Sequence, residues 1–218
     1  MDKKELLQYI DDKRVAVIRK IFWPIFAPLR RRRLNNDDFS IISNNCLGGV
    51  IYLYYHMKKT SPTAGGYFYA DDYIKFLSNL KYYTSLDIKM IKAEESKHYD
   101  DLKKNKRSDM PVGVLDDIEF VFVHYLDPQE AYNSWMNRAK RINFDNLIVT
   151  FCYQYQCNDD LIYKFAEMPQ YNKKMIIAAK PFEGIDWVNV VKGNSDGSVE
   201  NHLTDWVRKF NITKLINK

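Results

Sequence analysis

Glycine, proline and cysteine are all scarce in this sequence. Its 218 residues include 8 Gly, 7 Pro and 3 Cys, and no segment repeats with the period of about 20 to 50 residues that solenoids show. This composition excludes collagenous, disordered and repeat proteins. Because the cysteines are odd in number and scattered, we expect reduced thiols in a cytoplasmic protein rather than a disulfide framework.

Long hydrophobic runs are also absent. The most apolar N-terminal stretch, residues 15–29, is interrupted by two basic residues and two prolines, and spanning a bilayer takes about 20 apolar residues. No small-residue cleavage site follows it, so we expect no secretory signal. The four histidines are scattered and Cys152 and Cys157 lack a second Cys/His pair, so no structural metal site is expected.

The basic excess is confined to the N-terminus. Residues 1–33 hold ten Lys/Arg and four Asp/Glu, a balance of +6, whereas the rest of the chain balances at −1. Nucleic-acid-binding domains spread basic surface over the folded body, so we expect no nucleic-acid partner.

These 33 residues form an amphipathic basic arm. Within it, residues 14–33 combine aromatic side chains with a closing run of four arginines (Phe22, Trp23, Phe26, Arg30, Arg31, Arg32 and Arg33). This pattern predicts a peripheral position on the anionic inner face of the cell membrane. The alternative is that the apolar residues pack on the domain and the arginines form a solvated linker.

The whole sequence is 46% hydrophobic, which is enough to form one hydrophobic core. Short β-rich runs alternate with helical patterns from residue 39, which predicts a single α/β domain with a mostly parallel sheet and helices on both faces. The domain is expected over residues 34–218, with a core at 39–182 and a C-terminal cap at 183–218. Strands are expected at 39–43, 67–70, 86–91, 118–123, 147–152 and 175–179, and helices at 48–58, 72–83, 128–141, 159–167 and 201–210.

Two local signals refine this outline. Asp127 and Asn158 are the expected N-caps of the helices that follow them. Residues 92–110 are dense in charge and lack an apolar period, so we expect a mobile surface excursion there, without chemistry.

Several conspicuous polar residues follow predicted strands. In open parallel sheets, ligands bind outside the carboxyl ends of the strands. We therefore expect the ends of separate strands to contribute to one site: Ser43, Asn44, Asn45, Cys46, Asp71, Asp72, His124, Tyr125, Cys152, Tyr153 and Lys180.

The strongest local motif is residues 43–49, Ser-Asn-Asn-Cys-Leu-Gly-Gly. Glycines let the backbone approach a ligand, free N–H groups at a helix start bind anions, and a thiol near that positive end ionises more easily. With His124 as base and Ser43, Asn44 and Asn45 as oxyanion donors, Cys46 would form a Cys-His acyl-transfer site in which Gly48 and Gly49 cradle a phosphate. The alternative is a buried structural cysteine with glycines that permit close packing.

Other candidates have similar pairs of interpretations. Asp71-Asp72 and Asp116-Asp117 could be metal-binding carboxylates of a nucleotide-sugar enzyme, or helix-capping and turn residues. The helix 128–141 and its exit could stack a sugar ring and hold a phosphate, or could carry only an ordinary buried tryptophan and a charged face. The residues concerned are Trp135, Arg138, Lys140, Arg141 and Asn143.

Five stretches carry a family resemblance: FSIISNNCLGGVIY (39–52), SPTAGGYFYADDYIKFLSNLKYY (61–83), PVGVLDDIEFVFVHY (111–125), EAYNSWMNRAKRINFDNLIVTF (130–151) and MPQYNKKMIIAAKPF (168–182). With them the chain resembles a bacterial family of the domain-of-unknown-function 1919 type, whose members are commonly labelled exopolysaccharide or capsule biosynthesis proteins. The resemblance implies an α/β fold and a role in surface-polysaccharide assembly, but no established reaction. Leu47 stands where an aromatic is expected, and residues 154–157 replace an Asp-Gly-Cys turn. The motif around Cys46 also looks like that of capsule acyltransferases that use coenzyme A and a Cys-His pair.

These observations lead to one functional hypothesis. The chain would transfer an acyl group from acetyl-CoA or another acyl-CoA to a hydroxyl of a glycan or lipid-linked oligosaccharide. Gly48, Gly49, Arg138 and Arg141 would contact the cofactor, and the acceptor would contact Asp71, Asp72, Tyr125, Trp135 and Asn143. The alternatives are a glycosyltransferase that uses a nucleotide sugar and a non-catalytic accessory protein of the assembly complex.

Overall fold

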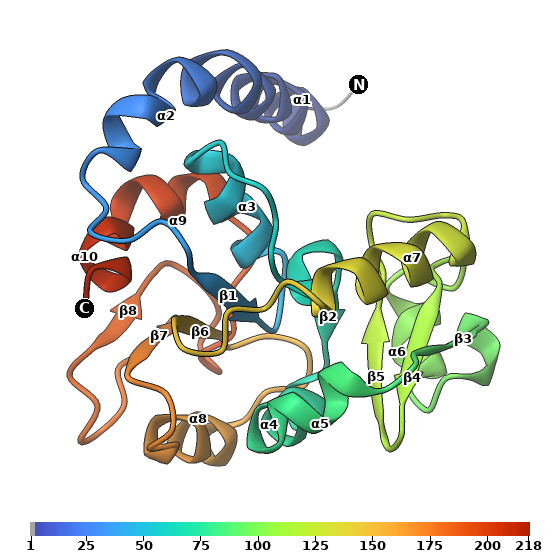
Figure 1. Cartoon of the computed structure of the whole chain (residues 1–218). Coiled ribbons are helices and arrows are strands. Elements are labelled where there is room, and N and C mark those ends of the chain that lie inside the picture. The colour runs from blue at the N-terminus through green and yellow to red at the C-terminus, as the bar shows by residue number, and fades with distance from the viewer. Residues whose placement is uncertain (1–2) are drawn as a thin grey trace.

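Two four-stranded sheets organise the molecule. The computed structural model describes residues 3–218, so residues 1–2 of the predicted arm lie outside the described residues. One sheet is parallel, with the order β1 (Ser40–Ser43), β6 (Leu147–Cys152), β7 (Lys173–Ala178) and β8 (Val188–Val190) (Figure 1). The other is antiparallel, with the order β2 (Tyr67–Phe68), β5 (Ile118–Val121), β4 (Val112–Leu115) and β3 (Lys89–Ile91).

The predicted α/β fold with a parallel sheet is confirmed. The sequence does not predict the second sheet. The segments 67–70, 86–91 and 118–123 are expected in the parallel sheet but contribute strands to the antiparallel one. Its centre is a hairpin, in which the two-residue turn Asp116-Asp117 joins β4 to β5 and Asp116 adopts a φ of 57°. A turn this short forces its two strands to run antiparallel.

Helices cover both faces of the parallel sheet. On one face lie α3 (Leu47–Tyr54), α9 (Leu203–Lys209) and α10 (Ile212–Ile216), and on the other α4 (Ala70–Ser78), α5 (Leu80–Ser85) and α8 (Asp159–Glu167) (Figure 1). Successive side chains of a strand point to opposite faces. Ile41 therefore packs in the core with α3, and Ile42 packs in the core with α4.

Both predicted N-caps are confirmed. The Asp127 carboxylate accepts the backbone N–H of Gln129 at the start of α7 (Pro128–Ala139). Asn158 accepts the N–H of Leu161 in the first turn of α8. Each side chain satisfies one of the backbone donors left free at a helix start.

Residues 92–110, expected to be a mobile excursion, contain regular secondary structure and buried anchors. The segment contains a 3-10 turn (Ala93–Glu95) and helix α6 (Tyr99–Lys104). Ala93 and Leu102 are buried, and Glu119 accepts hydrogen bonds from the Ser96 hydroxyl at 2.5 Å and the Lys97 N–H at 3.1 Å. A few apolar anchors are enough to fix a segment whose other side chains are charged and face water.

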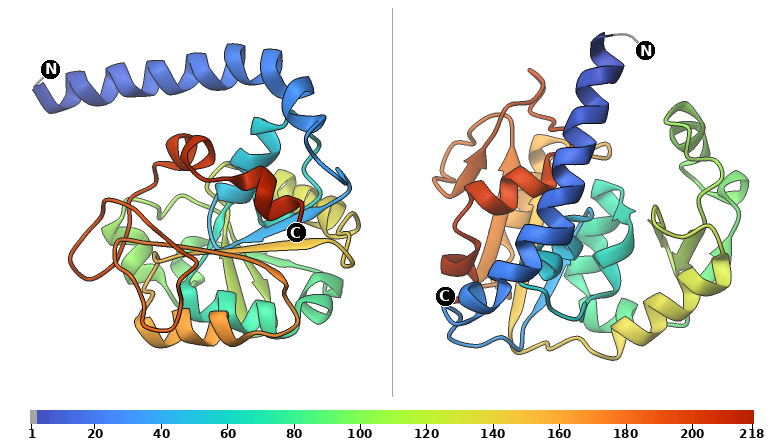
Figure 2. Two further views of the ribbon diagram at one scale, coloured as in Figure 1. Left: turned by 90° about the vertical axis from the view of Figure 1, so that its left-hand side faces the viewer. Right: turned by 90° about the horizontal axis from the view of Figure 1, so that it is seen from above.

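The N-terminal arm is helical and lies across α3 and α9 (Figure 2). It consists of α1 (Lys3–Val17), a π-helical turn (Ile18–Phe22) and α2 (Trp23–Arg31). Trp23 and Ala27 are buried, and Arg30 donates to the Tyr54 carbonyl at 2.7 Å. The inner face of the arm therefore packs on the domain.

The outer face of the arm is apolar and exposed. It presents seven large side chains to solvent: Ile10, Val17, Ile21, Phe22, Ile25, Phe26 and Leu29. Within residues 3–218, no helix combines the length and the apolar character that a membrane-spanning segment needs.

Candidate functional site

Cys46 and His124 meet where the two sheets join. Cys46 follows β1 and caps the start of α3, and His124 follows β5. The sheets are linked there because the Phe68 N–H of β2 donates to the Asn44 carbonyl at 3.0 Å. The Cys46 Sγ lies 3.3 Å from the His124 Nε2, which confirms the predicted proximity of these two side chains.

The thiol of Cys46 is not activated in the resting protein. Burial raises the pKa of Cys46 to about 11, although the charges of Lys59, Arg107 and Arg19 favour the thiolate. The predicted easy ionisation is therefore wrong, because desolvation outweighs the effect of the nearby cations. The fully buried thiol of Cys152 is less acidic still, with a pKa raised to about 12.

His124 is held neutral. Desolvation lowers its pKa, and the positive charges of Lys59, Arg19 and Arg138 lower it further. A neutral imidazole beside a neutral thiol is a general base with its proton donor in place, not a preformed thiolate–imidazolium pair.

Ser43, Asn44 and Asn45 are used by the scaffold. The Ser43 hydroxyl donates to the Asn45 carbonyl and accepts the Gly48 N–H. Asn44 forms two hydrogen bonds with the backbone of Cys152, and the Asn45 side chain donates to Gln154 and accepts the Leu47 N–H. All three are buried. They position Cys46, so their predicted role as oxyanion donors is corrected to a structural one.

Gly48 and Gly49 serve close packing. A Cβ on Gly49 would lie 2.7 Å from the Ala64 carbonyl oxygen, and one on Gly48 would lie 3.0 Å from the Ser43 hydroxyl. Both glycines are buried, and the N–H groups of Leu47 and Gly48 at the helix start are already bonded. The predicted phosphate cradle is therefore wrong, since neither the glycines nor these two donors can reach a ligand.

Of the residues that the sequence predicts as ligand contacts on helix α7 and its exit, Arg138 lies next to the site. Arg138 Nη2 donates to the Tyr125 hydroxyl at 2.8 Å, and Tyr125 follows His124 directly. Arg141 lies exposed beyond the end of α7. Asn143 donates hydrogen bonds to Asp38. Asp38 precedes β1, so Asn143 lies at the opposite end of this strand from Cys46. Arg138 and Tyr125 are kept as site residues, and Arg141 and Asn143 are not.

The predicted acceptor residues Asp71, Asp72 and Trp135 also lie apart from Cys46. Asp71 is exposed on α4. Asp72 is buried and accepts from Lys97 at 2.7 Å, His98 at 3.3 Å and the Glu119 N–H at 3.0 Å. Trp135 is buried in an aromatic core with Phe68, Phe76, Phe120 and Phe122. The buried Asp72 and Trp135 are therefore part of the scaffold and not the acceptor contacts that were predicted.

The other predicted pairs and ligand sets have local roles. Asp116 and Asp117 accept from Tyr82, Tyr83 and Lys75 around the hairpin turn. Lys180 pairs with Asp159 at 2.8 Å. Among residues 3–218, no group of three or more His, Cys, Asp or Glu side chains is arranged to hold a metal ion.

Three cations near the Cys46–His124 pair were missed. The charges of Lys59, Arg107 and Arg19 act on Cys46. The Arg107 guanidinium lies 4.8 Å from the ring centroid of Tyr67, which is stacked on Tyr155 with centroids 3.9 Å apart. Because these cations come from loops and from the arm, no periodicity in the sequence connects them with Cys46.

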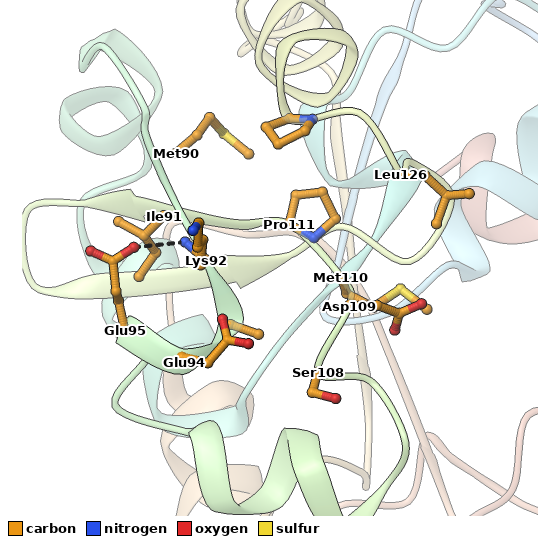
Figure 3. Close-up of a pocket in the computed structure, with 12 residues that line it drawn as sticks. Met90, Ile91, Lys92, Glu94, Glu95, Ser108, Asp109, Met110, Pro111 and Leu126 are labelled. Atoms are coloured by element: carbon orange, nitrogen blue, oxygen red, sulfur yellow. Dashed lines mark hydrogen bonds between the residues drawn. The ribbon is translucent and has the colours of Figure 1, made fainter.

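Cys46 and His124 line none of five cavities that open on the described residues. Cavities of about 340 and 620 Å³ flank the arm, and Arg19 lines both. A third, of about 460 Å³, opens beside β3, between Met90, Pro111 and Leu126 (Figure 3). None of the residues predicted for the site lines this third cavity.

Comparison with known proteins gives a family but no reaction. The family described as "Domain of unknown function (DUF1919)" matches residues 17–217. An uncharacterised protein of Haemophilus influenzae is 28% identical over 138 residues, which cover 63% of this chain. The match spans 60% of that relative's length.

Proposed function

The chain belongs to the DUF1919 family, and we propose that it is a transferase of exopolysaccharide or capsule biosynthesis that moves an acyl group from coenzyme A to a sugar hydroxyl. The observation that carries this proposal is the 3.3 Å contact between Cys46 Sγ and His124 Nε2 at the end of β1. The His124 side chain is exposed, so a substrate can reach the pair from solvent.

The first half-reaction loads Cys46. His124 Nε2 takes the thiol proton as the sulfur of Cys46 bonds to the carbonyl carbon of the acyl thioester. The bond from that carbon to the sulfur of coenzyme A breaks, and His124 passes the proton to the departing thiolate. A neutral imidazole is needed at the start, and the lowered pKa of His124 provides it.

The second half-reaction transfers the acyl group. The sugar hydroxyl gives its proton to His124 while its oxygen bonds to the carbonyl carbon. The carbon–sulfur bond to Cys46 breaks, and the sulfur takes the proton back from His124. Both steps pass through an oxyanion, for which the positive charges of Lys59, Arg107 and Arg19 offer stabilisation in place of the bonded side chains of Ser43, Asn44 and Asn45.

The arm supports a membrane-surface location for this reaction. The arm combines exposed apolar side chains such as Phe22 and Ile25 with the exposed cations Lys20, Arg32 and Arg33, the composition of a helix that lies on an anionic bilayer. Arg19 on the same arm acts on Cys46. An arm bound to the membrane would therefore hold the site near a lipid-linked acceptor.

A glycosyltransferase remains the second candidate. The cations near Cys46 would also suit a nucleotide sugar, but the carboxylates proposed for that chemistry do not contact the pair. Asp71 is exposed and Asp72 is fully bonded elsewhere.

Mass spectrometry of the purified full chain tests the acyl-transfer proposal. After incubation with acetyl-CoA and an acid quench, the intact protein should gain one acetyl group, and peptide mapping should place it on Cys46. The variants Cys46→Ala and His124→Gln should stay unmodified, whereas the matched control Cys152→Ala should be acetylated like the wild type. Absence of acetylation, or equal acetylation of Cys46→Ala, would overturn the proposal, and a co-purified nucleotide sugar would favour the glycosyltransferase.

Vesicle binding tests the arm separately. Trp23 and Ala27 of the arm are buried against the domain, so removing the arm would expose the surface of α3 around Tyr54 on which Trp23 packs. Substitutions on the outer face of the arm are therefore the better probe. Phe22→Ser with Ile25→Asn should weaken sedimentation with anionic vesicles about tenfold or more, because two exposed apolar side chains lose their burial in the bilayer. Tyr82→Ser, an exposed aromatic outside the arm, is the control. Equal binding of both variants would reject the membrane surface as the partner of the arm.

A further inference from the structure

Two arginines lie on either side of the Cys46–His124 pair. On one side, Cys46 Sγ is 3.6 Å from the Gly66 carbonyl, and the next residue, Tyr67, carries the Arg107 guanidinium 4.8 Å from its ring centroid. On the other side, Tyr125 follows His124 and accepts a 2.8 Å hydrogen bond from Arg138.

Lys59 connects the two sides. Its charge acts on Cys46, on His124 and on Arg138, so it adds a third positive charge to the surroundings of the pair. It is only partly exposed, and a partly desolvated cation beside a second cation is unfavourable unless an anion joins them.

These cations differ from others in the molecule by lacking acidic partners. Lys75, Lys97 and Lys180 each form an ion pair with an aspartate at 2.7 to 2.8 Å. Among the described residues, no Asp or Glu lies within ion-pair distance of Lys59, Arg107 or Arg138. Three cations around the Cys46–His124 pair without a carboxylate leave positive charge unneutralised, which suits an anionic ligand.

From this arrangement we infer that Lys59, Arg107 and Arg138 bind the diphosphate group of the transfer donor beside Cys46. The inference rests on the proposed function, because it names the chemical group by which the proposed transferase would recognise its donor. A diphosphate presents several oxygens to separated cations, and guanidinium groups bind such oxygens in bidentate fashion. The stacked rings of Tyr67 and Tyr155 hold the Arg107 guanidinium in place.

The side chains of Lys59, Arg107 and Arg138 form the inferred anion site, in place of the glycine turn that the sequence predicts. Gly48 and Gly49 are buried against β1 and Ala64, so a phosphate cannot approach their backbone. Coenzyme A and nucleotide sugars both contain a diphosphate, and the shared group is what these cations recognise.

Calorimetric titration of the full chain with inorganic pyrophosphate tests the inference. We expect saturable binding to the wild type that weakens with added salt, because binding is charge-driven. Lys59→Gln, Arg107→Gln and Arg138→Gln should each raise the Kd about tenfold, the size expected for one hydrogen bond to a charged group. Lys75→Gln, which removes a cation already paired with Asp117, should leave the Kd unchanged.

Two further measurements separate the possible outcomes. Arg107→Lys keeps the charge, so it should recover part of the affinity if Arg107→Gln unfolds the chain. If the wild type binds pyrophosphate but is not acetylated on Cys46, the anion site is retained and acyl transfer is rejected. Tighter binding of coenzyme A than of UDP identifies an acyl donor, and the reverse identifies a nucleotide sugar. No saturable binding, or equal weakening by Lys75→Gln, would overturn the inference.

Discussion

Two polar clusters in this molecule each contain a histidine, and they differ in how completely their charges are paired. In the first, the buried Asp72 accepts from Lys97, His98 and the Glu119 N–H, and Tyr69 stacks on the His98 ring at 3.7 Å. Every oxygen of the carboxylate has a partner. Such a cluster has no capacity left for a ligand, and its role is to join α4 to the antiparallel sheet.

The second cluster is built the opposite way. Cys46 and His124 touch each other, and the cations around them have no carboxylate to neutralise them. Complete pairing marks scaffold and incomplete pairing marks a site that a ligand completes. Substitutions test this comparison, because they should affect function in the Cys46 cluster and stability in the Asp72 cluster.

The largest expected effect is the loss of transfer in Cys46→Ala. Removing the nucleophile should lower the rate of sugar acylation by about a thousandfold or more, equivalent to about 4 kcal/mol in the activation free energy. The free energy of unfolding should change by about 1 kcal/mol or less, since only one sulfur atom is removed. Acylation kinetics and urea titration give the two values. A variant that keeps full activity would show that Cys46 belongs to the scaffold.

The converse effect is expected for Asp72→Ala. Removing one member of a buried charged network leaves its partners unpaired, which costs about 3 kcal/mol of unfolding free energy. Pyrophosphate binding should stay unchanged in the fraction that remains folded. Urea titration measures the loss, and Asp71→Ala on the same helix, at an exposed position, is the control that should differ little from the wild type.

Asp72 also gives this stability a pH dependence. Burial opposes its ionisation, but hydrogen bonds from His98, Lys97 and the Glu119 N–H hold its pKa below the ordinary value. A depressed carboxyl pKa contributes stability that is present above the unfolded pKa of about 3.9 and is lost as the pH falls through the folded pKa. The difference in unfolding free energy between the wild type and Asp72→Ala should therefore shrink below about pH 4.

How much of this could be predicted from the sequence differs between the two clusters. The contact of Cys46 with His124 was predicted from one shared parallel sheet, whose strand ends gather ligand-binding residues. The structure brings the two residues together in another way, because β1 belongs to the parallel sheet and β5 to the antiparallel sheet, and the two sheets join at Asn44 and Phe68. The surrounding cations were not predicted, since Lys59 and Arg107 lie in loops without periodicity, and the position of Arg107 depends on the buried anchor Leu102, whose carbonyl accepts the Arg107 N–H. Trp135 was misread for a related reason, because a helix pattern does not tell a core face from a binding face.

The fold shows the same limit. β6 and α8 were predicted with the bounds they have, because each contains a clear apolar period bounded by a polar cap or loop. β4 was missed, since its four residues contain a glycine and follow a charged loop. Without β4, its hairpin with β5 cannot be recognised, so the sequence predicts one sheet where the structure has two.

A smaller effect concerns the pH dependence of Cys46 alkylation. With a pKa raised to about 11, the thiolate fraction should grow about tenfold for each pH unit between about pH 7 and 10, and the alkylation rate should grow with it. The buried Cys152 should react more slowly throughout. Iodoacetamide labelling followed by peptide mass spectrometry gives both rates. A plateau below pH 8 would instead reveal a thiolate–imidazolium pair, and the neutral-pair mechanism would be wrong.

The smallest expected effect is on the titration of His124 itself. Partial desolvation and the charges of Lys59, Arg19 and Arg138 lower its pKa, so the midpoint measured by NMR should lie below the ordinary value of about 6.5. Lys59→Gln removes one of the opposing charges and should move the midpoint up by less than about one unit, whereas Lys75→Gln should not move it. Added pyrophosphate should raise the midpoint in the wild type, because a bound anion favours the imidazolium. If it does so in the wild type and much less in Lys59→Gln, the anion site and the base are electrostatically coupled, and a donor would prepare His124 to accept the Cys46 proton as it binds.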